Sequence, residues 1–332
     1  MMEFSITPYA GDSPMRPWPA LAEKAFCLKG DFLPAEGLFF FDSPPSGCRA
    51  NSGAEAPPAF VLIHGLGDEA DTWRHLIPLL NSRGYRVLAP DLPGFGRSVA
   101  SGKFTLKSYA NAVLSLIEAA VRPLAPFDGR PDENARPGRP AVFLAGSSMG
   151  ALVVEEAAIR KPEFARGIVL IDGSIPGGPQ NPGLFALAKL LFRRKWYRAY
   201  RDDAEGAWAS LRPYYADLDS LPPADKEFLR QRVAARVESC AQERAFFAVQ
   251  RSLVRTYMTC SSRFARKIRQ YNGKILLLWG EADRIIPLSS AKAFQSLRGD
   301  IGLEIISGAG HLPHQEKPAE TARLMVDFAE RW

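Results

Sequence analysis

Gly146-Ser147-Ser148-Met149-Gly150 is the stretch of this sequence that decides the fold. It follows the apolar run Ala141–Ala145 and precedes Ala151–Arg160, which has helical periodicity. A GxSxG motif between a strand and a helix forms a tight turn, where glycines avoid collisions and the central serine is presented at the tip. A chance match in a Ser/Gly-rich turn would lack that context. We therefore predict Ser148 as a nucleophile, with Ser147 at the variable position.

Short apolar runs on both sides of this motif predict the rest of the sheet. They are rich in Val, Ile and Leu: Ala59–Ile63, Arg86–Ala89, Ala141–Ala145, Gly167–Ile171, Lys274–Trp279 and Leu303–Ile306. Their apolarity is continuous, which predicts strands buried on both faces of a parallel sheet. Helical patterns alternate with them at Ser108–Val121, Ala151–Arg160 and Pro318–Trp332. This alternation predicts an α/β fold with a mostly parallel, doubly wound sheet.

Two regions depart from the alternation. Residues 1–58 form an extension in which Lys24–Leu28 and Gly37–Phe41 are expected to pair as antiparallel strands, followed by a loop over Ser43–Pro58. Residues 174–272 lack strand signals and contain helical stretches such as Leu184–Arg201 and Ala224–Val237. We expect residues 59–173 and 273–332 to form the core, and 174–272 to form a helical lid over the carboxyl edge of the sheet. The proline-rich stretch Pro126–Pro140 is expected to be an exposed loop.

A serine hydroxyl needs a base to take its proton. The chain has four histidines. His311 follows the last apolar run and so falls at the carboxyl end of a strand, where a site at the sheet edge needs it. His314 is interpreted as a surface or packing residue at a helix start. His64 is expected to shape its own loop by local hydrogen bonds.

The base in turn needs a carboxylate that orients it and stabilises its cationic form. Asp283 follows the run Lys274–Trp279 and is the predicted acid. The chain order Ser148, Asp283, His311 is the order expected for this kind of turn. Glu281 in the same loop and Asp172 after Ile171 are competitors. Asp172 is the stronger of the two because it also follows a strand.

The oxyanion of the reaction needs backbone N–H donors. One is predicted at Met149, the residue after the nucleophile, and one at Leu66 in the loop after the first core strand. With these motifs in order, the sequence resembles the α/β-hydrolase superfamily, in its lid-bearing branch of esterases and carbon–carbon bond hydrolases. The stretches His64–Gly67, Asp91–Ser98 and His311–Pro318 also look like that family's patterns, and Asp91 is given a structural role. The resemblance covers roughly Ala59–Ser174 and Lys274–Trp332.

The resemblance implies a serine hydrolase that cleaves a carboxylic ester through an acyl-enzyme, with no metal or organic cofactor. A serine at the turn disfavours relatives with an aspartate nucleophile. Carbon–carbon bond hydrolysis of diketone-like substrates uses the same triad and is the main alternative. An acyltransferase or perhydrolase would need a site that favours an acceptor other than water. A ligand-binding receptor on the same scaffold is a further alternative, although such proteins often lose a triad residue.

The segment Leu184–Arg201 mixes large apolar residues with a basic cluster over Arg193–Arg201. It is interpreted first as an amphipathic helix with solvated cations. Leu187, Leu191 and Phe192 are candidate contacts for an apolar acyl group of a small-molecule substrate. Attachment to an anionic membrane surface, or pairing of the arginines with a substrate carboxylate, stays open.

Composition limits the remaining function classes. The 332 residues carry a net charge of +6 and are 46% hydrophobic, as in ordinary globular proteins. No nucleic-acid-binding module is recognisable, so no nucleic-acid partner is expected. The four cysteines show no metal-binding spacing and are expected to be reduced thiols. No signal peptide or membrane-spanning stretch is apparent, which predicts a cytoplasmic location.

Overall fold

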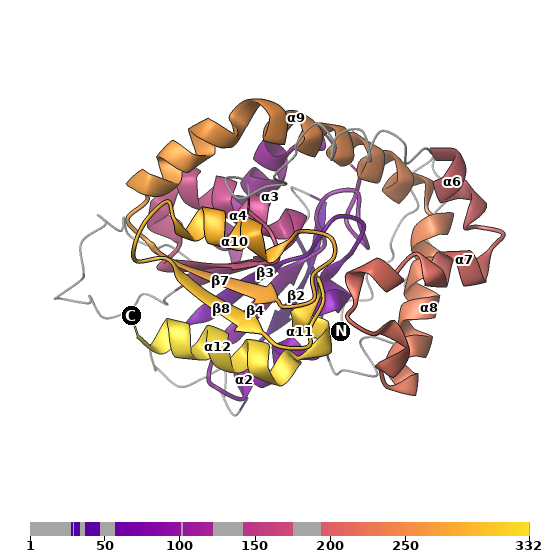
Figure 1. The fold of residues 1–332 in the computed structure, drawn as a ribbon, viewed down its shortest axis with the longest axis horizontal. Coiled ribbons are helices and arrows are strands. Elements are labelled where there is room, and N and C mark those ends of the chain that lie inside the picture. Colours follow the sequence, from indigo (N-terminus) through magenta and orange to yellow (C-terminus); the bar gives the residue numbers. More distant parts are fainter. Residues whose placement is uncertain are drawn as a thin grey trace.

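The computed structural model describes residues 28, 30–33, 37–46, 57–100, 102–121, 142–174 and 194–331. These residues form one eight-stranded sheet with helices on both faces, the α/β hydrolase fold (Figure 1). The strands, in the spatial order β1-β2-β4-β3-β5-β6-β7-β8, are β1 Gly30–Leu33, β2 Leu38–Ser43, β4 Arg86–Pro90, β3 Ala59–Ile63, β5 Val142–Ser147, β6 Gly167–Ile171, β7 Lys274–Gly280 and β8 Gly302–Ile306. β1 and β2 are antiparallel, and the other six strands are parallel.

All six apolar runs of the sequence correspond to strands, with Ala141 lying outside the described residues. β3, β5 and β6 are buried at every residue, because helices cover both faces of the central sheet. The outermost strand β8 differs from the predicted burial, since Glu304 and Ile305 are exposed and the Ile305 side chain is 44% accessible. An edge strand has a neighbour on one side only, so its side chains are covered less completely.

Two layers of helices enclose the sheet. In Figure 1, α3 Leu106–Ala120, α4 Met149–Arg160 and α10 Leu288–Gln295 lie on one face, and α2 Leu76–Asn81 and α12 Pro318–Glu330 lie on the other. Each layer has its own apolar core, because side chains of successive residues in a strand point to opposite faces. α3, α4 and α12 agree with the predicted helical stretches within a few residues.

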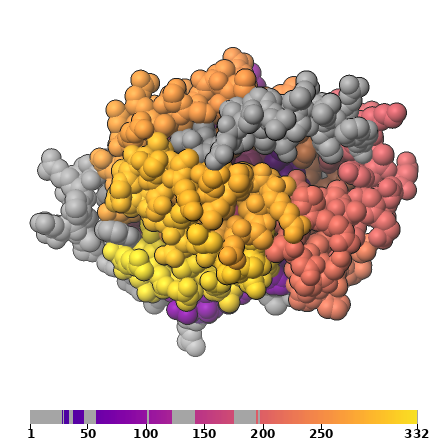
Figure 2. All heavy atoms as spheres, in the orientation of Figure 1, coloured from indigo at the N-terminus to yellow at the C-terminus, as the bar shows by residue number. Residues whose placement is uncertain are grey.

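Several helices lie between β6 and β7. They are α6 Arg194–Ala199, α7 Ala204–Ala209, α8 Pro223–Glu238 and α9 Cys240–Gln270, with 3₁₀ turns η3 Arg212–Tyr214 and η4 Leu218–Ser220. In Figure 2 the atoms of the α7 and α8 region abut those of the carboxyl-terminal segment. Short elements elsewhere are η1 Ala70–Trp73, η2 Pro162–Phe164 and α11 Pro313–Glu316.

The amino-terminal expectations are met only in part. β1 begins at Gly30. Leu28 is the one described residue of the predicted strand Lys24–Leu28, and it is not in a strand, so the predicted position is wrong at that residue. Lys24–Cys27 lie outside the described residues, as do Pro126–Pro140 and residues 47–56 of the expected loop. β2 includes all of Gly37–Phe41 except Gly37, whose positive φ of 63° forms the turn from β1.

Candidate active site

The turn between β5 and α4 holds Ser148 in a strained conformation. Ser148 has a φ of 54° and a ψ of −117°, a combination that non-glycine residues rarely adopt. The Ser148 N–H donates to the carbonyl of Ile171 in the adjacent strand at 2.8 Å. Such strain is typical of functional sites, where the surrounding structure enforces it. The side chain is half-buried at the carboxyl edge of the sheet.

The glycines on either side of Ser148 are sterically required. A Cβ on Gly146 would lie 2.3 Å from the carbonyl of Gly150, and one on Gly150 would lie 2.1 Å from the carbonyl oxygen of Ile63. Gly173, after β6, approaches the Ser148 carbonyl oxygen so closely that an added Cβ would be 2.3 Å away. These distances explain why the GxSxG spacing predicted the turn.

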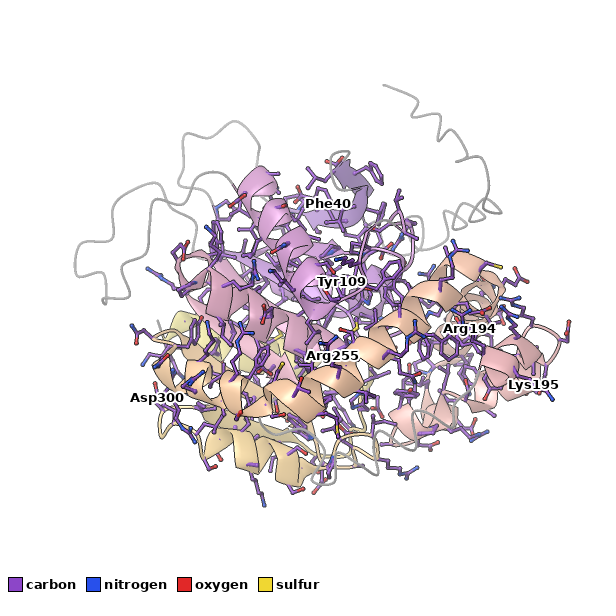
Figure 3. The ribbon with its side chains drawn as sticks, turned by 90° about the horizontal axis from the view of Figure 1, so that it is seen from above. Phe40, Tyr109, Arg194, Lys195, Arg255 and Asp300 are labelled. Atoms are coloured by element: carbon purple, nitrogen blue, oxygen red, sulfur yellow. The ribbon has the colours of Figure 1, made fainter. Side chains whose placement is uncertain are left out.

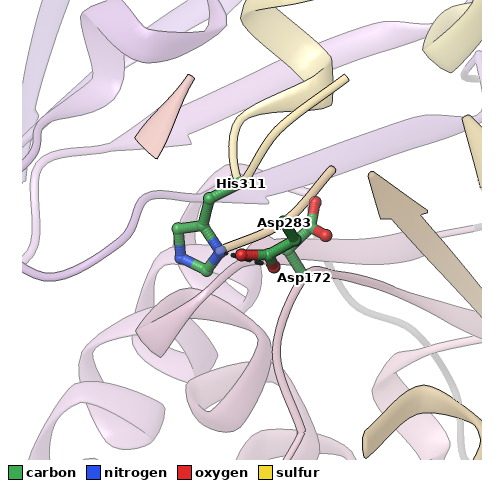
Figure 4. A group of neighbouring side chains, drawn as sticks. All are labelled: Asp172, Asp283 and His311. Carbon is green, nitrogen blue, oxygen red and sulfur yellow. Dashed lines mark hydrogen bonds and ion pairs between the residues drawn. The ribbon is translucent and has the colours of Figure 1, made fainter. Parts of the chain in front are cut away.

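His311 and Asp283 meet at the same edge. His311 Nδ1 lies 2.8 Å from Asp283 Oδ2, and both side chains are at most 1% exposed (Figure 4). The Asp283 carboxylate is oriented from its other oxygen, which accepts from the backbone N–H groups of Ile285 and Ile286 at 2.7 and 3.0 Å. His311 Nε2 is buried and has no hydrogen-bond partner in the described part of the chain.

Asp172, the stronger competing acid, is part of the same cluster. It is fully buried, has a φ of 48°, and accepts from the Gly280 N–H at 2.9 Å. Burial and the adjacent Asp283 charge raise the Asp172 pKa well above its usual range. Asp172 therefore holds its proton more tightly than an ordinary carboxyl group does. Because Asp172 precedes Gly173, it also connects this cluster to the Ser148 turn.

The other competitor, Glu281, is exposed and is bound to other partners. Its Oε2 accepts from the Ser307 hydroxyl at 2.7 Å and the Gly308 N–H at 3.2 Å, and these hydrogen bonds lower its pKa. Asp172, Asp283 and His311 are also the one group within the described residues with metal-ligand geometry, their ligand atoms lying within 4.8 Å. His311 Nδ1 and Asp283 Oδ2 of this group are hydrogen-bonded to each other, which is the arrangement of a base oriented by an acid.

The loop after β3 lies beside Ser148. A Cβ on Gly65 would be 3.4 Å from Ser148 Cβ, which brings the predicted donor Leu66 to the serine turn. Met149 is the first residue of α4, whose first N–H groups have no partner within the helix. His64 fixes this loop: it accepts from the Leu92 N–H through Nε2 and so donates to the Gly65 carbonyl through Nδ1, both at 2.8 Å. The interpretation of His64 as a local organiser is confirmed.

Asp91 has the structural role assigned to it. Its carboxylate accepts from the Ala70 N–H at 2.7 Å and forms an ion pair with Arg97 at 2.7 Å. Arg97 also pairs with Asp71 at 2.6 Å. Asp91 is therefore a buried junction between two loops near the serine turn.

Helix α8 is tied to the loop after β3 by buried ion pairs that sequence reasoning did not predict. Arg232 contacts Glu69 and Asp71 at 2.7 Å, and its side chain is 3% exposed. Arg236 contacts Glu69 and Asp68. Burial alone would raise the pKa of Glu69, but the charges of Arg232 and Arg236 lower it to about 2. The ion pairs therefore anchor the helical segment to the loop that carries Leu66.

We expect Arg232→Met to destabilise the protein by about 3 kcal/mol, because it leaves buried carboxylates without a full set of partners. The matched control is Arg212→Met, which removes an exposed pair with Asp219 and is expected to have a much smaller effect. Urea unfolding at pH 7 measures both changes. Equal losses in the two variants would contradict the structural importance of the buried network.

The histidine loop is also held by the helical segment. His311 N–H donates to the Tyr214 carbonyl at 2.8 Å. Glu316 accepts from the N–H groups of Gly310 and Ala216, both at 2.8 Å, and so bridges the two segments. A Cβ on Gly310 would lie 2.6 Å from the Ala216 nitrogen. Glu316 falls within the quoted stretch His311–Pro318, but no spacing rule indicated that it bridges the segments.

His314 is a packing residue and not a surface residue. It is fully buried against the Trp73 ring, with centroids 4.3 Å apart, and its Nε2 lies 2.8 Å from the Thr72 hydroxyl. Burial lowers the pKa of His314 to about 3, and the charge of the nearby His311 is a second cause of this shift. His314 is therefore neutral near pH 7.

Because His314 has a lower pKa in the folded state than in the unfolded state, its contribution to stability is present above about pH 6.5 and is lost as the pH falls. The loss reaches about 2 kcal/mol by pH 5, where the unfolded chain is protonated and the folded one is not. In His314→Gln we expect lower stability at pH 7 but a flatter change between pH 7 and 5. Urea midpoints at both pH values measure this, and parallel curves for the two proteins would contradict it.

The predicted substrate contacts Leu187, Leu191 and Phe192 lie outside the described residues, as does Arg193 of the basic cluster. The rest of the cluster is partly neutralised. Arg198 and Arg201 pair with Glu243 at 2.9 and 2.8 Å, and Arg194 lies 3.8 Å from it. The cluster is therefore not simply a solvated face. No helix in the described ranges is long and apolar enough to cross a membrane. Cys240 and Cys260 are free thiols.

Comparison with known proteins identifies relatives of this chain. A model of the alpha/beta hydrolase family matches residues 60–324. A pimeloyl-(acyl-carrier protein) methyl ester esterase of Methylococcus capsulatus is 26% identical over 273 residues, 82% of this chain and 94% of that protein. A 2-hydroxy-6-oxo-6-phenylhexa-2,4-dienoate hydrolase of Comamonas testosteroni is 27% identical over 279 residues, 81% of this chain and 87% of that protein.

Solved structures show the same fold. The crystal structure of a bacterial membrane phospholipase A aligns with a TM-score of 0.69 and 23% identity, over 94% of this chain and 88% of that one. The 2-hydroxy-6-oxo-6-phenylhexa-2,4-dienoate hydrolase of Rhodococcus sp. strain RHA1 aligns with a TM-score of 0.65 and 19% identity, over 90% of this chain and 98% of that one. At these identities the likeness shows the fold alone.

Proposed function

The chain belongs to the alpha/beta hydrolase family, and from that premise we propose that it is a serine hydrolase cleaving carboxylic esters through Ser148, His311 and Asp283. One combination of observations carries this proposal. A serine with positive φ stands at a strand–helix turn, and a buried histidine bound to a carboxylate lies at the same sheet edge. Strand order supports their proximity, because β5, β6 and β7 are adjacent and parallel.

In the first step, Ser148 Oγ attacks the ester carbonyl carbon and His311 Nε2 takes its proton. Nε2 is suited to this role because Nδ1 already donates to Asp283. The N–H groups of Met149 and Leu66 donate hydrogen bonds to the carbonyl oxygen as negative charge develops on it, next to the positive end of the α4 dipole. His311 then donates the proton to the leaving alcohol oxygen, and an acyl-enzyme remains.

In the second step, His311 removes a proton from water, whose oxygen attacks the acyl carbon. The second tetrahedral intermediate collapses, the bond to Ser148 Oγ breaks, and the proton returns to the serine. Asp283 stabilises the imidazolium in both steps. Asp172 contributes as a neutral neighbour that limits repulsion within the cluster. The steps themselves consume only the ester and water.

The substrate is proposed to be a small molecule with an apolar acyl group, bound beneath the helical segment of residues 174–272, which acts as a lid. The contacts of Arg232 with Glu69 and of Ala216 with Glu316 support a lid fixed to the core at two places. The relative from Methylococcus capsulatus is an esterase, which favours ester cleavage. The relative from Comamonas testosteroni keeps carbon–carbon bond hydrolysis as the second candidate.

Initial rates on p-nitrophenyl esters of increasing acyl length test the proposal, with a vinylogous diketo acid assayed in parallel. Ester hydrolysis with a clear chain-length optimum, lost in Ser148→Ala, is expected. A diketo acid cleaved far faster than every ester would move the function to carbon–carbon hydrolysis. If the wild type hydrolysed no substrate faster than Ser148→Ala, the proposed function would be wrong and a receptor role would replace it.

A further inference from the structure

The long helix α9 carries a run of positive charge without acidic residues. Between residues 244 and 270 the sequence contains no Asp or Glu, and it contains the basic residues Arg244, Arg251, Arg255, Arg263, Arg266, Lys267 and Arg269. This run extends over most of a 31-residue helix. A helix of an ordinary globular domain carries both signs of charge on its exposed face, so the absence of acids is unusual.

The two sides of α9 differ sharply. Its buried residues Val249, Leu253, Tyr257, Phe264 and Ile268 recur at intervals of four or seven and belong to the main apolar core. The opposite side is exposed and carries Arg251, Arg255, Arg263, Arg266 and Arg269 at intervals of three, four or eight residues. Met258 lies among them with 56% of its side chain accessible, one of four large apolar residues so exposed within the described residues. We call these six exposed residues the α9 face.

The arginines of the α9 face form none of the salt bridges found among the described residues. The arginines elsewhere on the helical segment are different: Arg232 and Arg236 are buried in ion pairs, and Arg194, Arg198 and Arg201 surround Glu243. Those arginines therefore contact carboxylates of the protein itself. The arginines of the α9 face have no such carboxylate among the described residues, so they can bind a partner outside the chain.

We propose that the α9 face is a docking surface for an anionic lipid bilayer. From residue 251 to residue 269 the helix is about 27 Å long. It is packed lengthwise on the protein, so its exposed side is a strip suited to a flat surface. Figure 3 shows α9 crossing the face seen from above, with Arg255 near its middle and Arg194 beside its amino-terminal turns. Guanidinium groups bind the lipid phosphates, and Met258 enters the interfacial region.

A planar lipid surface fits the α9 face better than a nucleic acid does. The buried stripe fixes α9 along its length, so the helix cannot enter a DNA groove as a recognition helix does. Among the described residues of α9 no aromatic side chain is exposed, so there is no platform on which bases would stack. The exposed cations and the apolar Met258 between them instead offer one surface both to lipid phosphates and to the apolar boundary of a bilayer.

Flotation with phosphatidylcholine vesicles, with and without about one third phosphatidylglycerol, tests the proposal on the whole chain. The test variant replaces Arg251, Arg255, Arg263 and Arg266 with Gln. The control variant, with the same change in net charge, replaces the exposed Arg83, Arg212, Arg323 and Arg331, which lie outside α9. Circular dichroism and the hydrolysis rate on a soluble ester establish that both variants are folded.

The wild type and the control are expected to float with the anionic vesicles only, and to be released in 0.5 M NaCl. The α9 variant is expected to partition at least about tenfold more weakly, because each cation near the surface contributes to attraction. Absence of binding by the wild type, or undiminished binding by the α9 variant, would overturn the proposal. Tighter arginine-dependent binding to duplex DNA or single-stranded RNA than to vesicles would overturn it in favour of a nucleic-acid surface.

Discussion

Ser148→Ala is expected to lower kcat for ester hydrolysis by about 10⁴-fold to 10⁶-fold, leaving only the residual rate supplied by binding and the oxyanion donors. The reason is that no acyl-enzyme can form without the serine oxygen. The fold should be unaffected, since Ser148 Oγ is not needed for any of the backbone contacts that hold the turn. Steady-state rates on the p-nitrophenyl ester that the wild type cleaves fastest measure kcat, and thermal unfolding measures the stability.

Ser147→Ala is the matched control for this prediction. Ser147 is adjacent in sequence, but its side chain is buried and its hydroxyl has no partner in the described part of the chain. We expect this variant to keep most of the wild-type rate. A loss in Ser147→Ala as large as that in Ser148→Ala would mean that disturbance of the turn, and not loss of the nucleophile, caused the effect.

Asp283→Asn is expected to lower kcat by about 10³-fold to 10⁴-fold with little change in KM. The Asn side chain keeps the shape of the acid, but it cannot stabilise the imidazolium of His311, and its amide nitrogen can force the wrong tautomer. The measurement is the full rate profile against substrate concentration. Because Asp283 contacts His311 directly, the loss should appear on every substrate that the enzyme cleaves.

Asp172→Asn distinguishes the role of Asp172 from the role of Asp283 in the cluster. Asn at this position still accepts from the Gly280 N–H and is neutral, as the raised pKa of Asp172 indicates for the wild type. We expect a loss of less than about tenfold. If Asp172→Asn were the more damaging change and Asp283→Asn kept most of the rate, then Asp172 would be the acid of the triad.

The strand, turn and helix around Ser148 and the parallel strands beside them could be predicted from short stretches of sequence. The glycines around Ser148 are required by contacts within 3 Å, so a short motif was enough to indicate the strand, the turn and the helix. The parallel strands were recognisable because burial on both faces demands continuous apolar runs. Burial of β8 was predicted less well, since its position at the sheet edge depends on strand order rather than on its own residues.

The supports of the candidate site were not predictable in the same way. Arg232 and Glu69 are 163 residues apart, and Glu316 and Ala216 are 100 apart. Nothing in the local sequence of either partner indicates the pair. The burial of His314 likewise depends on Trp73 from a distant turn. Each of these interactions arises only when the helical segment and the core pack together, so they belong to tertiary structure and not to motifs.

The charge of the α9 face, unlike these contacts, is visible in the sequence, but its exposure is not. Its charge is plain in the sequence between residues 244 and 270, but a count of basic residues cannot tell a paired arginine from a free one. The basic cluster within Leu184–Arg201 is equally plain in the sequence, yet its Arg198 and Arg201 pair with Glu243. The exposed side of α9 was identifiable only after its buried stripe had been located.

The most direct test of the central claim is to react the protein with a fluorophosphonate and locate the adduct by peptide mass spectrometry. A nucleophile activated by His311 at an oxyanion site attacks such a reagent, whereas an ordinary surface serine does not. We predict a single stoichiometric adduct on Ser148, absent from Ser148→Ala and formed much more slowly in Asp283→Asn. A stable adduct on Ser147 or another residue, or no adduct while ester hydrolysis continues, would contradict the account.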